Sequence, residues 1–299
     1  MPANVREIKG RMKAVGNIER ITKTMQMIAT ARFQSMQKRA IAAQAYTHKI
    51  AEVVGELADS IGDGDGGSQK MSPLLVKPEE STGKVALLVL TSNRGLCGGY
   101  NANIIRKANA FFADHDDVHL EVAGKKGNAY FKFTGKTVDV YHDEFDDDPS
   151  YEEVEAVAES YMKDFVAGKY DAVYVIYTAF ISMAKQEAEV LQLLPMQKPE
   201  SAEEAGDSHG KSKVMYDFSP NPEDLLAELL PVTVKTRLFQ CFNESLVSEQ
   251  LARMVAMKSA TDSAGKMKKS LGRQYNRARQ SAITTELSEI IGGAAALDQ

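Results

Sequence analysis

The sequence VREIKGRMKAVGNIERITKTMQMI, residues 5–28, places an apolar side chain at every third or fourth position. It lies in a longer stretch, residues 3–59, that contains no proline and no glycine between Gly16 and Gly55. Alternating steps of three and four are typical of a helix that packs against another helix along a narrow seam. The seam positions that this spacing predicts are Val5, Ile8, Met12, Val15, Ile18, Ile21, Met25 and Ile28. Val15 and Ile18 are only three residues apart where the repeat requires four, which predicts a phase shift in the seam.

The C-terminal end of the chain carries the same kind of pattern. Asn221 followed by Pro222 and two acidic residues is a helix start signal, because asparagine caps a helix and proline fits its first turn. No proline follows Pro231, so one helix can run to Leu297, with a kink or a break expected at Pro231 because proline lacks a backbone donor. The apolar positions are Val247, Leu251, Met254, Ala260, Ala264, Met267, Leu271, Tyr275, Ala278 and Ala282, then Ile283, Leu287, Ile290, Ala294 and Leu297.

Neither helix can bury its apolar stripe alone. Because the two helices lie at opposite ends of the chain, we expect them to pack on each other as an antiparallel, two-stranded, left-handed coiled coil. The C-terminal helix is the longer one, so its end is expected to project beyond its partner.

The middle of the chain has the pattern of an α/β fold. Strands are expected at residues 85–90, 118–122, 138–141 and 172–177, and helices at 101–112, 126–133 and 150–166, the last opened by a capping box at Ser150 and Glu153. Further apolar segments follow at 189–194 and 214–218. Strands that alternate with helices predict a mostly parallel sheet. The fold class is therefore α/β: a coiled coil made by residues 1–60 and 221–299, with an inserted Rossmann-like domain at 61–220.

Composition and charge narrow the class of protein. Of 299 residues, 43% are hydrophobic and 26% are charged, as in globular proteins, and no apolar run is long enough to span a membrane. The first residues lack a secretion signal, and two cysteines, Cys97 and Cys241, cannot build a disulfide framework, so we expect a cytoplasmic protein. Residues 1–50 hold ten Lys and Arg against two acids, and residues 253–279 hold eight against one, although the whole chain has a net charge of −5. Nucleic acid is not expected as a partner, because aromatic residues do not interleave with these bases.

The sharpest sign of an enzyme is the glycine loop Gly95-Leu96-Cys97-Gly98-Gly99 between the first strand and its helix. Such a loop can bind phosphate, but this one matches neither the dinucleotide fingerprint nor the P-loop, and a tight turn explains it equally. His115 and His119 have the spacing of metal ligands on a helix, but a strand is expected to begin at Val118, which favours a solvated loop. The acids at 146–148 precede a helix start, where acids are favoured without calcium. No cofactor or metal is expected.

Four segments resemble one known family, the γ subunits of bacterial F-type ATP synthases. They are NIERITKTMQMIA at 17–29, SNRGLCGGYN at 92–101, SEQLARMVAMKSAT at 248–261 and YNRARQSAITTELSEIIGGA at 275–294. The resemblance extends over nearly the whole chain in the family's order. The residues at 198–213 lack the paired cysteines of the redox-regulated chloroplast type.

The resemblance implies a non-catalytic rotary shaft that couples proton flow through the membrane sector to ATP synthesis or hydrolysis in β subunits. Its coiled coil would stand inside a ring of α and β subunits, and its α/β domain would sit on the ε subunit and the membrane rotor ring of c subunits. The location implied is peripheral, at the cytoplasmic face of the bacterial plasma membrane, with no transmembrane segment. The residues implied at the β-subunit contacts are Met25, Arg253, Gln280, Thr284, Glu286 and Glu289, and Tyr216 is implied at the foot.

Two other functions remain open on the residues alone. One is a nucleotide-binding α/β enzyme with a coiled-coil appendage, which would bind its ligand at Gly95–Gly99. The other is a scaffold that dimerises through residues 1–59.

Overall fold

The computed structural model describes the chain except for residues 1–4, 63–72, 77–80, 146–147, 197–221 and 298–299. Tyr216 and the apolar segment 214–218 lie outside the described residues. The chain forms two compact units. We call them the helical unit, residues 1–31 and 253–299, and the α/β unit, residues 32–252.

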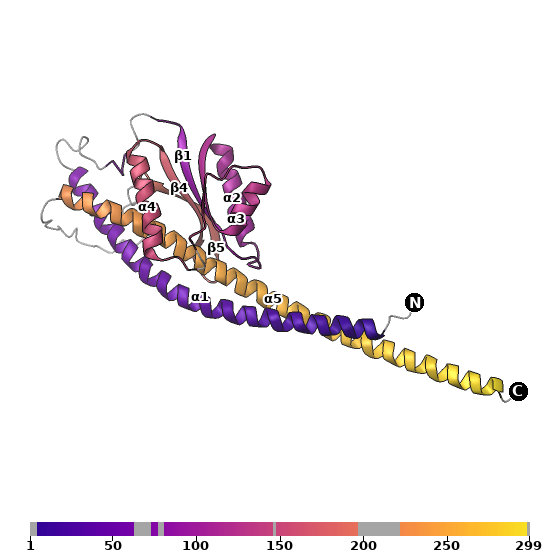
Figure 1. Ribbon diagram of the computed structural model, residues 1–299. Coiled ribbons are helices and arrows are strands. Elements are labelled where there is room, and N and C mark those ends of the chain that lie inside the picture. Colours follow the sequence, from indigo (N-terminus) through magenta and orange to yellow (C-terminus); the bar gives the residue numbers. More distant parts are fainter. Residues whose placement is uncertain (1–4, 63–72, 77–80, 146–147, 197–221, 298–299) are drawn as a thin grey trace. The chain divides into compact units, whose positions relative to one another are not determined.

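The helical unit is built by the two ends of the chain. Helix α1 spans Val5–Gly62 and helix α5 spans Pro222–Leu297. The Thr261 hydroxyl donates to the Thr22 hydroxyl at 2.8 Å, and the Lys268 ammonium donates to the Glu19 carboxylate at 2.8 Å. The residue number of the α5 partner rises from 261 to 268 as that of the α1 partner falls from 22 to 19, so the two helices run antiparallel. They lie side by side in Figure 1. The expected pairing of the two ends is confirmed.

The seam of the helical unit differs from the expected one. The buried or half-buried positions of α1 in this unit include a series that steps by four and three without interruption: Ile8, Met12, Val15, Glu19, Thr22, Gln26 and Ala29. Val5, Gly16, Met25 and Thr30 are half-buried as well. The phase shift expected after Val15 is wrong, and Ile18, Ile21 and Ile28 lie outside the seam, 51%, 59% and 53% exposed. On α5, Met267 was expected in the seam but is exposed, whereas Met257, which was not expected there, is buried. The seam accepts polar residues at Glu19 and Thr22 because each meets a polar partner across it.

Helix α5 runs without a break through Pro231. The break considered at this residue is therefore wrong. At its other end, α5 continues beyond the seam position Ala282, and Ile283, Leu287 and Ile290 are all more than half exposed. The described part of α1 starts at Val5, so this end of α5 has no partner within the described residues and projects past α1, as expected (Figure 1).

The α/β unit contains a five-stranded sheet in the order β3-β2-β1-β4-β5. The strands are β1 Lys84–Leu90, β2 Asp117–Ala123, β3 Val140–His142, β4 Ala172–Phe180 and β5 Gln186–Leu194. The first four are parallel, and β5 pairs antiparallel with β4, which confirms a mostly parallel sheet. Strand β3 begins two residues later than expected, because Asp139 instead exchanges hydrogen bonds with Leu120 through its backbone N–H and its carboxylate.

Helices cover both faces of this sheet (Figure 1). Helices α2 Tyr100–Asp114 and α3 Lys125–Phe133 pack on the face that receives Leu87 and Val89 of β1. Helix α4 Tyr151–Val166 and the adjoining parts of α1 and α5 pack on the face that receives Leu88 and Leu90. The capping box expected at the start of α4 is present, with Ser150 and Glu153 bonded reciprocally. Consecutive residues of β1 therefore enter different cores, which is why the strand is apolar throughout.

Candidate partner-binding surface

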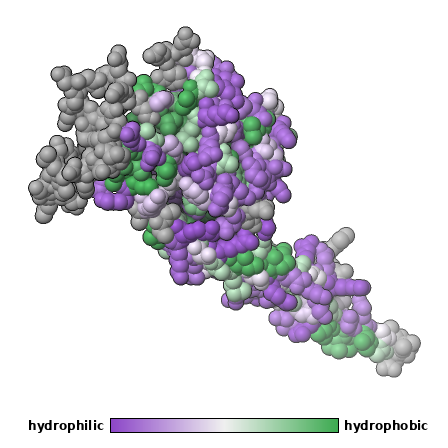
Figure 2. Space-filling view, turned by 60° about the vertical axis from the view of Figure 1, so that its left-hand side comes forward, coloured by the Kyte–Doolittle hydropathy of each residue, from purple (hydrophilic) through white to green (hydrophobic). Residues whose placement is uncertain are grey.

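The helical unit exposes a second apolar stripe that the sequence reading assigned to the seam. It consists of Ile18, Ile21 and Ile28 on α1, each more than half exposed. Val255 and Met267 of α5 are exposed to a similar degree, and Figure 2 shows apolar surface along the paired helices and near their end. Continuing the four-three count from Ile8 would have placed Glu19 and Thr22 in the seam and these isoleucines outside it. Exposed apolar groups on two-stranded helices are a surface that a partner can cover.

The helical unit also exposes many basic side chains. The exposed ones are Arg6, Lys9, Arg11, Lys13, Arg20 and Lys23 on α1, and Lys258, Lys266, Lys268, Lys269, Arg273, Arg277 and Arg279 on α5. A few of them pair within the unit, as Arg11 does with Glu7 at 2.6 Å and Lys268 with Glu19. The excess of positive charge suits a partner surface that carries carboxylates.

The residues expected at β-subunit contacts lie on this unit but differ in accessibility. Gln280, Thr284, Glu286 and Glu289 are exposed on α5. The Thr284 hydroxyl donates to the Gln280 carbonyl within the helix, so it is positioned by its own turn. Met25 is half-buried. Arg253, in contrast, is buried, with 8% of its surface exposed.

Matched isoleucine variants test the seam. Ile8→Ala, at a buried seam position, is expected to lower the free energy of unfolding of the helical unit by about 2 kcal/mol, because it leaves a cavity. Ile21→Ala, on the exposed stripe, should change it by less than ~0.5 kcal/mol. Urea unfolding of the full chain, followed by circular dichroism, measures both. Equal losses in the two variants would contradict the seam as described.

The glycine loop after β1 lies beside a helix cap. Its neighbours cap helix α3: the Gly127 N–H donates to the Thr91 hydroxyl, the Lys126 N–H to the Ser92 carbonyl, and the Lys125 N–H to the Asn93 side chain. These bonds occupy amides at the start of α3, whereas the helix that follows the glycine loop is α2, which begins at Tyr100.

Helix α5 lies across the carboxyl ends of the central strands, where Rossmann-like domains bind ligands. Thr178 lies in β4 after Ile176, the last residue of that strand that pairs with β1. Its N–H donates to the Ser245 hydroxyl at 3.2 Å, and its carbonyl accepts from the Ser248 hydroxyl at 3.3 Å. Two serines of α5 thus take the place of a neighbouring strand.

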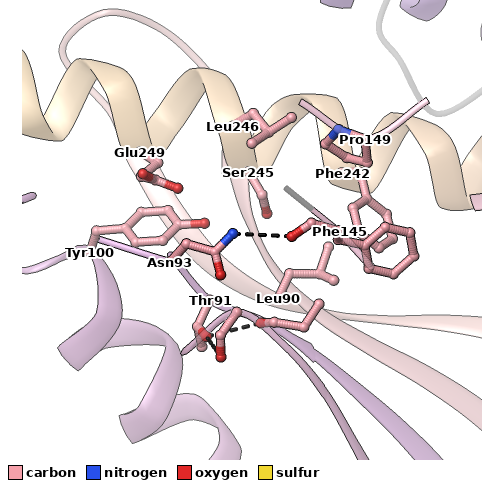
Figure 3. A pocket seen from close by; sticks show the side chains of 12 residues that line it. Leu90, Thr91, Asn93, Tyr100, Phe145, Pro149, Phe242, Ser245, Leu246 and Glu249 are labelled. Carbon is pink, nitrogen blue, oxygen red and sulfur yellow. Dashed lines mark hydrogen bonds between the residues drawn. The ribbon is translucent and has the colours of Figure 1, made fainter. Parts of the chain in front are cut away.

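The hollows left beside α5 do not suit a nucleotide. One, shown in Figure 3, has a volume of about 40 Å³ and is covered by Phe242, Ser245, Leu246 and Glu249 of α5. Another, of about 160 Å³, lies beside the first turn of α2. Neither is lined by a lysine or arginine of the described chain, and the first has a carboxylate in its wall. The geometry does not support a nucleotide site here.

The histidines considered as metal ligands are not brought together. His115 follows the end of α2 and stacks on Phe111, with ring centroids 4.0 Å apart, whereas His119 lies in β2. Among the described residues, no group of three His, Cys, Asp or Glu side chains could hold a metal ion. No helix in the described ranges is both long and apolar enough to cross a membrane.

The fold and this surface define a class of protein: its paired terminal helices expose apolar and basic side chains, and its α/β unit has the ligand crevice filled by its own helix. Sequence comparison identifies the class further. The family described as ATP synthase matches residues 4–297. The ATP synthase gamma chain of Rhodopirellula baltica is 44% identical over 301 residues, 99% of each chain, and that of Heliobacterium modesticaldum is 40% identical over 98% of this chain and 99% of its own.

Solved structures show the same fold. A chain of the Euglena gracilis mitochondrial ATP synthase (OSCP/F1/c-ring) aligns with a TM-score of 0.64 at 18% identity, covering 98% of this chain and 94% of its own. A chain of the Tetrahymena thermophila central stalk and c-ring aligns with a TM-score of 0.56, covering 80% of this chain and 99% of its own. The chain belongs to the ATP synthase gamma-chain family and is a non-catalytic subunit of ATP synthase.

Proposed function

We propose that this subunit is a rotary shaft that transmits rotation, driven by proton flow through the membrane sector, to catalytic β subunits. The observation that carries the proposal is the helical unit, whose two antiparallel helices present exposed isoleucines and a positive surface. A single shaft inside a ring of repeated subunits presents a different face to each of them. A contact can bias a catalytic site only by the difference in its affinity for the states of that site, so rotation would pass the bias from one β subunit to the next.

The proposed β-subunit contacts are Gln280, Thr284, Glu286 and Glu289, with Met25 and Arg253 completing the set. The exposure of the first four supports a direct contact. The burial of Arg253 favours a role in shaping the surface more than in offering its full side chain to a partner. Tyr216 is proposed to meet the ε subunit and the rotor ring, and the basic side chains are proposed to face carboxylates of the α and β subunits. The proposed location is peripheral, at the cytoplasmic face of the bacterial plasma membrane.

Co-purification tests the assembly. A tagged full-length chain, expressed with the α, β and ε subunits of its own organism, should purify with one chain per ring and should activate ATP hydrolysis by the ring. A chain that instead purifies as a homodimer, or that binds ATP by itself at micromolar concentration, would contradict the proposal.

Gln280 tests the coupling contact. Gln280→Ala should reduce proton-driven ATP synthesis in membrane vesicles roughly fivefold or more, the lower end of usual coupling energies, while the affinity of the β subunits for nucleotide stays unchanged. Gln274→Ala is the matched control, because Gln274 is exposed on the same helix and is not among the proposed contacts. If Gln280→Ala and Arg253→Ala both leave synthesis at the level of the control, these two residues do not form the coupling contact.

A further inference from the structure

A buried group of ionisable side chains lies between β2, β3 and α4, outside the partner-binding surface. The Glu121 carboxylate in β2 is 2.7 Å from the His142 imidazole in β3 and accepts a hydrogen bond of 2.8 Å from the Tyr161 hydroxyl in α4. Glu121 and His142 are each 8% exposed. Charged residues are rarely buried unless they are paired, and Glu121 and His142 are both buried and paired.

The geometry requires a positive charge on His142. Its Nε2 lies 2.7 Å from Glu121 Oε2, and its Nδ1 lies 2.8 Å from Glu144 Oε1. A carboxylate only accepts, and a neutral imidazole has one N–H, so both bonds can be made together only by the doubly protonated ring. His142 is thus an imidazolium held between two carboxylates.

The surrounding charges act in the same direction. Burial alone would lower the pKa of His142, but its hydrogen bonds to Glu121 and Glu144 outweigh burial and raise the pKa above its ordinary value of 6.5. Burial alone would raise the pKa of Glu121, but contacts with His119, His142 and Tyr161 lower it to about 2. The other groups that face the pair are Asp139, 3.6 Å from His119, and Tyr170, whose ring lies 5.3 Å from that of His119 and 5.0 Å from the Lys169 ammonium.

His142 also begins a short segment, residues 142–145, that contacts two other parts of the unit. Phe145 is buried and packs against Phe242 of α5, with ring centroids 4.8 Å apart. Its carbonyl accepts a hydrogen bond of 3.1 Å from the Asn93 side chain, next to the glycine loop (Figure 3). Glu144, between these residues, is one of the two acceptors of His142. The bonds of His142 and the packing of Phe145 under α5 are thus only three residues apart in one segment.

We propose that protonated His142 is a clamp that fastens residues 142–145 to the sheet and, through Phe145, to α5 and the glycine loop. When the pH rises through its folded-state pKa, His142 releases one proton to water, one of its two carboxylate bonds is lost, and the segment loosens. The stabilisation is complete below the unfolded-state pKa of about 6.5 and disappears as the pH rises through the raised folded-state value. Glu121, whose pKa is lowered, acts oppositely: its contribution is present above about 4.5 and is lost only as the pH falls toward about 2. The clamp therefore opens on the alkaline side.

Amide hydrogen exchange on the full-length chain tests the clamp. After correction for intrinsic exchange, protection of the amides of residues 143–145 should fall about tenfold or more between pH 6 and pH 9.5, the loss expected when a bond of roughly 1.4 kcal/mol is broken. His142→Gln should show the low protection at every pH. His115→Gln is the matched control, since His115 lies in the same unit but bonds only to a backbone carbonyl, and it should keep the wild-type pH dependence.

A second variant keeps the test decisive if His142→Gln does not fold. Glu144→Gln replaces a charged acceptor with a neutral amide at a half-exposed position, so it should shift the loss of protection to lower pH. In the same samples, the NMR titration of the His142 ring should have a midpoint above 6.5. Protection that does not change with pH in the wild type, or the same change in Glu144→Gln, would overturn the proposal.

Discussion

Replacing Gly124 with alanine is expected to destabilise the α/β unit by at least ~4 kcal/mol, the range reached only when a substitution has no room at all. Gly124 precedes helix α3 with a φ of +99°, a conformation that residues with a Cβ rarely adopt. A Cβ added there would lie 2.1 Å from the Thr91 carbonyl oxygen and 2.6 Å from the carbonyl carbon. Both are backbone atoms at the end of β1, so no side-chain rotation can relieve the clash.

The loss should extend beyond α3 itself. Thr91 bonds to the backbone at the end of β2, because its N–H and its hydroxyl both donate to the Ala123 carbonyl. The Thr91 hydroxyl also accepts from the Gly127 N–H. Moving Thr91 away from a new methyl group would therefore break the junction that holds β1, β2 and α3 together.

Gly135→Ala is the matched control for this prediction. Gly135 also has a positive φ, +75°, but an added Cβ there would meet nothing within 4 Å. It should cost only the conformational strain, about 1–2 kcal/mol. Denaturant unfolding of the two variants, followed by circular dichroism, separates strain from collision. Similar losses in both would show that the close approach at Thr91 is not what Gly124 provides.

The elements of the fold could be predicted where their signals are local. The apolar run at 85–90, the Ser150–Glu153 capping box and the absence of proline in residues 3–59 each act within a few neighbouring residues, and the structure contains the corresponding strand and helices. The pairing of the two terminal helices could be predicted because each has a narrow apolar stripe that it cannot bury alone.

The seam could not be predicted fully because it depends on the partner helix. Counting apolar residues favoured Ile18 and Ile21, yet the seam contains Glu19 and Thr22, which become acceptable only opposite Lys268 and Thr261. These partners are more than 200 positions away in the sequence, with separations of 249 and 239 residues. The roles of Gly124 and His142 are likewise set by long-range contacts with Thr91 and Glu121. The exposed isoleucine stripe was missed for the same reason.

A second large effect is expected at Leu57, near the end of α1. This side chain is fully buried, in the core that Val54, Leu230 and Val234 share with the sheet. Leu57→Ala should lower the free energy of unfolding of the α/β unit by about 2–5 kcal/mol, because the neighbouring helix and strands cannot all collapse into the cavity. The control is Ile41→Ala on the same helix, where the side chain is 58% exposed and the loss should stay below ~0.5 kcal/mol.

The Leu57 variant also tests how α1 contributes to the α/β unit. Helices α1 and α5 each run through both units without interruption. If the last turns of α1 are part of the α/β core, Leu57→Ala should raise hydrogen exchange in β1 and α4, whose Leu88 and Val154 belong to that core. The amides around Val15 and Ala29, in the seam of the helical unit, should exchange as in the wild type. Exchange that increases only along α1 would mean that this helix is held by α5 alone.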